Sequence, residues 1–127
     1  MTKITEHLIK DFFSTNSLKY RSSHKKLSLP IINRIYKKMI NDINFDDIKV
    51  CDGLIIDGHH RYISSIIAGI KIGETKSLKT SATKEYNWNE VEFTESEWDT
   101  DDKILELNIL DADYNSISLE QIIDIIK

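Results

Sequence analysis

The residues best suited to chemistry lie in one short stretch of the chain, Asp57-Gly58-His59-His60-Arg61. They follow an apolar segment at residues 54–56 and begin a longer, partly apolar segment at residues 59–68. A strand, a tight turn and a helix are therefore expected in that order. The first backbone amides of such a helix have no partner within it and lie at the positive end of its dipole. We therefore expect a site for an anion, phosphate in particular, at the start of this helix.

Each residue of this motif has an expected chemical role. Gly58 allows a sharp turn and brings its amide close to a ligand. Arg61 supplies a forked, permanently charged donor that suits phosphate. His59 and His60 can donate hydrogen bonds from their rings, and either could exchange a proton near neutral pH. Asp57 is a candidate catalytic carboxylate, because it could fix a histidine tautomer, orient Arg61, bind a metal with the phosphate or accept a proton.

The same residues also have structural explanations. Asp57 could cap the helix, and one of His59 and His60 could pack or bond to the backbone; the sequence does not distinguish the two rings. Arg61 is the hardest to explain in this way, because burying a charge among apolar residues without an anionic partner is costly. A zinc site is not expected, since adjacent histidines point in different directions and no Cys/His pair has ligand spacing.

A polar, basic segment at residues 14–28 precedes the motif and is expected to be a loop or a short extended piece. Lys19, Arg21 and His24 lie in it and could close over a bound phosphate, although a solvated loop is the simpler explanation. The lone Cys51 stands in an apolar run, which favours a small buried hydrophobic residue over a nucleophile.

Spacing and capping residues predict the elements that position the motif. The second expected helix carries Arg34, Lys37 and Lys38 on its outer face. Two strands joined by a hairpin turn at Asp52-Gly53 are expected next, whereas residues 70–78 and 86–93 are weaker strand candidates. The expected helices cover residues 4–13, begin at Ser28-Leu29-Pro30, cover residues 58–68, begin at Asp99-Thr100, and begin at the capping box Ser118–Gln121; the two strands cover residues 48–51 and 54–56.

The composition is typical of one α+β domain spanning residues 1–127. Of the 127 residues, 40% are hydrophobic and 30% are charged, and there is one proline. Charges interrupt every apolar stretch, so none is long enough to span a bilayer and no membrane partner is expected. The first residues lack signal-peptide architecture, which favours the cytoplasm; a domain exported by a dedicated system as an effector would look the same.

The charge of the chain is distributed unevenly. The net charge is −4, but residues 1–84 hold fifteen Lys and Arg against eight Asp and Glu, a balance of +7. Residues 85–127 hold two against thirteen, a balance of −11. A solvated acidic face explains this pattern most simply. The functional alternative is that the basic part faces a phosphate-rich ligand while the acidic part screens it or meets a basic partner.

The segment DGLIIDGHHRYISSIIAGI, nineteen residues from Asp52 to Ile70, resembles the signature of the ParB/sulfiredoxin superfamily. The likeness is to the branch with an Asp-Gly-His-His-Arg motif. That branch includes free-serine kinases and, with the same fold, ParB-like domains assigned as nucleases. It implies a compact ParB/sulfiredoxin-like α+β domain with a small mixed sheet flanked by helices. In that fold the turn and helix cradle nucleotide phosphates or a phosphate-bearing backbone.

Carried over by position, Gly58, His59, His60 and Arg61 would contact phosphate, and Asp57 would be a catalytic or metal-orienting carboxylate. Mg²⁺ accompanying a nucleotide is the one cofactor that the resemblance implies. Sulfiredoxin chemistry needs a cysteine where this motif has histidines, and the kinases need an upstream glutamate that the basic segment lacks. The chain also has no room for the additional domains of a chromosome-partitioning protein.

The segment around residues 98–115 resembles the tails of ParB-like domains in bacterial polymorphic toxin systems. This second resemblance implies an immunity protein or another protein partner at the acidic C-terminal region. The leading hypothesis is accordingly a phosphate- or nucleotide-binding domain, with nuclease, nucleotidase or phosphotransferase activity as a toxin-type effector. The alternatives are a non-catalytic module that binds nucleotide or nucleic acid, and a protein-docking component of a toxin and immunity system.

Overall fold

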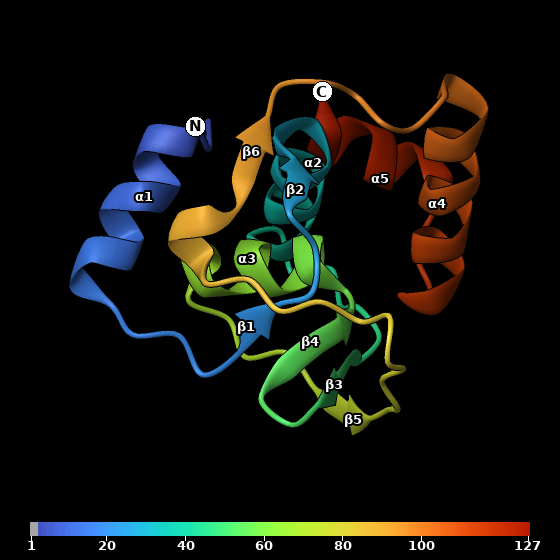
Figure 1. Ribbon diagram of the computed structural model, residues 1–127. Coiled ribbons are helices and arrows are strands. Elements are labelled where there is room, and N and C mark those ends of the chain that lie inside the picture. Colours follow the sequence, from blue (N-terminus) through green and yellow to red (C-terminus); the bar gives the residue numbers. More distant parts are fainter. Residues whose placement is uncertain (1–2) are drawn as a thin grey trace.

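Local sequence signals set most of the element boundaries in the computed structural model, which describes residues 3–127 (Figure 1). The elements in chain order are α1 (Glu6–Thr15), β1 (Arg21–Ser22), β2 (Lys26–Ser28), α2 (Leu29–Met39), β3 (Ile48–Cys51), β4 (Leu54–Asp57), α3 (His59–Ala68), β5 (Glu74–Lys76), the 3-10 turn η1 (Trp88–Glu90), β6 (Glu92–Thr94), α4 (Asp101–Tyr114) and α5 (Leu119–Ile126).

The predicted helix starts are confirmed where a capping side chain defines them. Ser28 accepts a hydrogen bond from the Ile31 amide at the start of α2, where Pro30 occupies the first turn. Thr100 caps α4, and Ser118 forms the expected capping box with Gln121 at the start of α5. The first helix begins at residue 6 rather than 4, because the Thr5 hydroxyl caps it.

The strands form a four-stranded mixed sheet and a second, two-stranded sheet, so the predicted α+β class is confirmed. The order in the larger sheet is β1-β4-β3-β5, in which β3 and β4 are antiparallel and the other two pairings are parallel. Asp52 and Gly53 make the expected hairpin turn, with φ values of 50° and 75°. In the smaller sheet β2 pairs with β6 in parallel.

The weaker strand predictions were only partly correct. Between residues 70 and 78 only Glu74–Lys76 is a strand, and residues 86–93 divide into a 3-10 turn and the short β6. The reason is local hydrogen bonding: Asn87 and Glu90 form a capping box that turns the chain before β6 can begin. Cys51 on β3 is half-buried rather than fully buried as expected.

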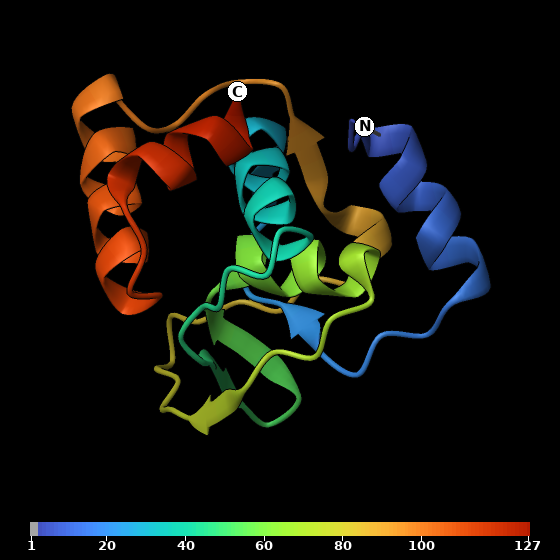
Figure 2. The same cartoon turned by 180° about the vertical axis from the view of Figure 1, so that it is seen from behind.

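Helices α2 and α3 pack together at the centre of the molecule and position the motif (Figures 1 and 2). The larger sheet lies beneath α3, α1 flanks one side, and α4 with α5 forms the opposite side (Figure 2). Most buried apolar residues, among them Ile32 of α2 and Ile63 of α3, belong to one core cluster. A small second cluster of Ile43, Ala112 and Ile122 holds α4 and α5 against the rest.

Helix α4 is mostly exposed. Of its fourteen residues only Asn108 and Ala112 are buried, while Leu105, Ile109, Leu110 and Tyr114 are exposed. None of the helices within residues 3–127 is long and apolar enough to cross a membrane.

Candidate functional site

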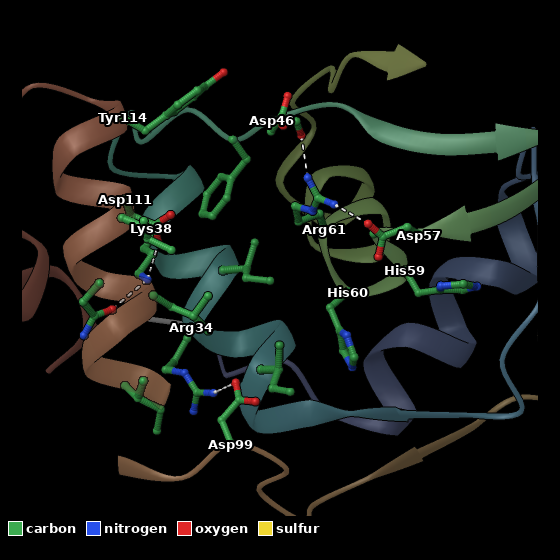
Figure 3. Close-up of a pocket in the computed structure, with 18 of the residues that line it drawn as sticks. Arg34, Lys38, Asp46, Asp57, His59, His60, Arg61, Asp99, Asp111 and Tyr114 are labelled. Carbon is green, nitrogen blue, oxygen red and sulfur yellow. Dashed lines mark hydrogen bonds and ion pairs between the residues drawn. The ribbon is translucent and has the colours of Figure 1, made fainter. Parts of the chain in front are cut away.

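A pocket of about 580 Å³ opens between the start of α3, helix α2 and helix α4 (Figure 3). Most of the predicted motif lies on one wall, and α4 stands opposite it (Figure 3). The lining residues of the motif wall and its neighbourhood are His24, Phe45, Asp46, Asp57, Gly58, His59, His60, Arg61 and Asp99. Those from α2 and α4 are Ile31, Arg34, Ile35, Lys38, Ile104, Leu107, Asn108, Leu110, Asp111 and Tyr114.

The amino-terminal end of α3 faces this pocket without a capping side chain. Gly58 is the N-cap residue, with φ of 93°, and makes no side-chain cap. The first hydrogen bond of the helix runs from the Tyr62 amide to the Gly58 carbonyl at 2.9 Å. Among the described residues, no partner accepts from the backbone amides of His59, His60 or Arg61. Three donors therefore remain available at the positive end of α3.

His59 is buried and electrically neutral. Its side chain is 2% exposed, and its Nε2 atom accepts a hydrogen bond from the Ser23 amide at 3.1 Å. The Ser23 hydroxyl donates to the Ile55 carbonyl at 2.6 Å, which leaves the amide as the donor to the ring. The His59 proton therefore resides on Nδ1, which is buried and has no partner within residues 3–127. Burial, helped by His24 and His60, lowers the pKa of His59 to about 3.

His60 is held in the same way on the other side of the turn. Its Nε2 atom accepts from the Ser28 amide at 3.0 Å, and its ring packs perpendicular to the Trp98 ring with centroids 5.4 Å apart. Burial first, then the charges of His24 and Arg34, lower the pKa of His60 to about 4. Both motif histidines thus support the backbone of the basic segment through a lone pair that a proton would otherwise take.

A third histidine joins the site from the basic segment. The His24 ring stacks on the His59 ring with centroids 3.9 Å apart, and it lines the pocket. Of the three candidate phosphate contacts in the basic segment, it is the one that the structure brings to the motif. Lys19 lies elsewhere, 3.5 Å from Glu74, and Arg21 pairs with Glu85 at 2.9 Å; neither lines the pocket.

Arg61 has acquired structural partners. Its Nη1 atom donates to the carbonyls of Asp46 and Asp47 at 2.8 and 3.1 Å, and its Nη2 atom lies 3.7 Å from Asp57 (Figure 3). These contacts satisfy the donors and the charge of the half-buried guanidinium, which explains how it is tolerated among apolar residues. Asp57 does not cap the helix, since Gly58 occupies that position, and its side chain is 66% exposed at the pocket edge.

Two cations of α2 line the pocket, and the sequence had placed them on the outer face of that helix. Lys38 is only 4% exposed, and its ammonium donates to Asn108 at 2.8 Å and to Asp111 at 2.6 Å, both on α4 (Figure 3). Arg34 pairs with Glu97 and Asp99 just before α4. The only available signal was the charge asymmetry, because the acidic segment supplies these partners.

That asymmetry is therefore partly an internal match between the two parts of the chain. Residues of the basic part pair with residues of the acidic part at several places: Arg21 with Glu85, Lys26 with Glu92, Arg34 with Glu97 and Asp99, and Lys38 with Asp111. Since the pairs of Arg21 and Lys26 are exposed, the match stabilises the fold mainly at Arg34 and Lys38, where the side chains are largely shielded from water.

The groups that could hold a metal are carboxylates at the pocket edge. Within residues 3–127, no three His, Cys, Asp or Glu side chains converge closely enough to hold a metal ion by themselves. Mg²⁺ that arrives with a nucleotide needs only one or two carboxylates in addition to phosphate oxygens. Asp57 and Asp46 both line the pocket and have the chemistry for that role.

The two buried rings predict that the protein loses stability when acidified. Unfolding returns both to a pKa near 6.5, so the unfolded chain binds protons that the folded chain excludes. The free energy of unfolding should fall as the pH drops from about 6.5, by roughly 2 kcal/mol for each ring at pH 5. Urea unfolding at pH 7, 6 and 5 measures this; a flat profile would contradict it. The lowered pKa of the Glu97 carboxyl acts only at still lower pH, outside this window.

His7→Gln is the matched control for that profile. His7 lies on α1 with an 88% exposed side chain, so its removal should leave the pH dependence unchanged. His60→Gln should flatten the profile by about half, because one of the two buried rings is gone.

Comparison with known proteins identified no relative of this chain. No family model, curated protein or solved structure matches the chain.

Proposed function

We propose that this chain binds a small phosphorylated ligand, with a nucleotide as the preferred class, in the pocket at the start of α3. The observation that carries the proposal is the uncapped amino-terminal end of α3: its first three backbone amides have no partner among the described residues, and the residues that bear them line a cavity of about 580 Å³. A phosphate group suits such a set of donors, and the volume matches a ligand of nucleotide size. The resemblance of the motif to ParB-like domains supports the same assignment.

The opposite wall of the pocket favours a ligand with an apolar or aromatic part. It is formed by aliphatic side chains of α2 and α4 together with the ring of Tyr114, and the Phe45 ring adds to the apolar lining of the pocket. A polar end that meets phosphate and an apolar wall that meets a base is the usual layout of a nucleotide site. Inorganic phosphates would use only the first of these features.

The cations at the pocket support binding but are already partnered. Arg34, Lys38 and Arg61 each contact a carboxylate. The attraction for phosphate therefore comes mainly from the helix end, and the negative charge of Asp57 next to it opposes an anion. This arrangement favours binding over catalysis by Asp57 acting as a base beside the phosphate.

Titration calorimetry with ATP and with pyrophosphate, each with and without Mg²⁺, tests the proposal. Both ligands should bind saturably, and ATP should bind at least about tenfold more tightly because only ATP reaches the apolar wall. Without Mg²⁺, Asp57→Asn should tighten both by roughly three- to tenfold, since it removes one negative charge near the anion. If Asp57 also holds Mg²⁺, adding Mg²⁺ should no longer strengthen ligand binding in the Asp57→Asn variant.

Asp52→Asn is the matched control, because it makes the same chemical change at the far end of β4. Asp52 is exposed on the hairpin turn and does not line the pocket. It should leave both affinities unchanged. Absence of saturable binding by either ligand, or an equal effect of the two variants, would count against the proposed site.

A further inference from the structure

We propose that His24, a residue outside the Asp57–Arg61 motif, is the group of this pocket that takes up a proton from solvent when an anion binds. The inference rests on the proposed phosphate site and adds to it a residue with a specific role. In its protonated form His24 would donate a hydrogen bond to a ligand oxygen that sits on the α3 amides. The proton comes from solvent when the anion binds and returns to solvent when it leaves, so no covalent bond changes.

The two histidines of the motif are unsuited to this role. Each uses its Nε2 lone pair to accept a backbone amide, from Ser23 in one case and Ser28 in the other. Protonation would break that bond and place a charge in a buried site. Their low pKa values express the same constraint. His59 and His60 therefore act as positioning residues that hold the basic segment against α3.

His24 has the opposite character. The residue is exposed, and its hydrogen bonds within residues 3–127 come from the backbone amide and carbonyl rather than from the ring. The ring lines the same pocket as Gly58, His59 and His60. It is thus the histidine of the pocket that can gain or lose a proton without disturbing the fold.

The backbone around His24 is held rigidly, which keeps the ring in place. The Ser22 hydroxyl accepts from the His24 amide at 3.0 Å and donates to the His24 carbonyl at 2.7 Å. The neighbouring Ser23 is tied to β4 through the Ile55 carbonyl, and His59 supports the ring from below by stacking. A ring placed in this way loses little freedom when it meets a ligand.

The surroundings of His24 have opposing effects on its pKa. On the pocket side, β4 contributes Asp57 and α3 contributes His59 and His60. A second hollow on its other side is lined by Lys25, Lys84 and Tyr86. Partial burial outweighs the charge of Asp57, so the pKa of His24 lies below its ordinary value; an anion bound at α3 would raise it.

The test combines NMR and calorimetry on the full 127-residue chain. Sulfate is the probe, because it keeps the same charge between pH 5.5 and 8 and any pH dependence then belongs to the protein. Sulfate should shift the backbone amide signals of residues 59–61 and move the titration of the His24 ring to higher pH. Its affinity should be at least about fivefold higher at pH 6 than at pH 8 in the wild type, and the same within twofold in His24→Gln.

His7→Gln is the control and should keep the full pH dependence, because His7 lies on α1 away from the pocket. If the amides of residues 59–61 respond to sulfate but the His24 ring does not, the inference is overturned while the proposed site stands. A His24→Gln variant with the pH dependence of the wild type would overturn it equally. If neither those amides nor any histidine responds to sulfate or pyrophosphate, the proposed site itself fails.

Discussion

Replacing Gly58 with alanine is expected to destabilise the protein by about 3 kcal/mol and to abolish anion binding. The residue has φ of 93°, where a side chain costs roughly 1–2 kcal/mol. An added Cβ would also lie 2.7 Å from the Ile48 side chain and 2.9 Å from the Arg61 guanidinium. Neither neighbour can move freely, since Ile48 is fully buried and Arg61 is tied to two carbonyls.

Gly69→Ala separates these two contributions. Gly69 ends α3 with φ of 70°, but nothing lies within 4 Å of its added Cβ. Its replacement should cost about 1 kcal/mol and leave anion binding intact, because only backbone strain remains. Urea unfolding of both variants, with sulfate titration of the folded fraction, measures the difference. Equal destabilisation by the two substitutions would show that the close approach of Gly58 to Ile48 and Arg61 contributes nothing.

The parts of the fold that could be predicted are those that depend on neighbouring residues. Ser28, Thr100 and Ser118 cap helices through bonds to residues three positions away, so the sequence contains both partners. Gly58 and Gly69 mark the two ends of α3 for the same reason. The strand, turn and helix start around Gly58 followed from these signals because they are local events, whereas the pocket also needs residues of α2 and α4 from elsewhere in the chain.

The roles inside the pocket depended on partners far along the chain and could not be predicted. The Nε2 lone pair of His59 is occupied by the amide of Ser23, which lies 36 residues earlier. The guanidinium of Arg61 donates to backbone carbonyls 14 and 15 residues earlier. The sequence offered both histidines as proton carriers because nothing near them shows that their lone pairs are occupied. The sequence indicated that Lys19, Arg21 and His24 alike could close over a bound phosphate. What singles out His24 is its stacking on His59, which depends on the parallel pairing of β1 with β4.

Replacing Lys38 with methionine is expected to destabilise the protein by about 2–3 kcal/mol and to loosen α4 first. Methionine keeps most of the aliphatic length but removes the ammonium that joins α2 to Asn108 and Asp111. The Asp111 carboxylate, with a side chain only 19% exposed, is then left without its cation. Since Asn108 and Ala112 are the only buried residues of α4, that helix has little else to hold it. Urea unfolding and amide hydrogen exchange of α4 measure the two effects.

Lys37→Met and the double variant Lys38→Met/Asp111→Leu distinguish loss of this ion pair from a general effect of removing a lysine. Lys37 makes only a 3.5 Å contact with the carbonyl of Lys127, so its replacement should change stability by less than about 0.5 kcal/mol. The double variant should recover to within roughly 1 kcal/mol of the wild type, because no unpaired charge remains. If Lys38→Met costs no more than Lys37→Met, α4 is held by its apolar contacts alone. Because α4 forms the wall opposite the α3 amides, the expected result makes this ion pair a determinant of the shape of the pocket as well as of stability.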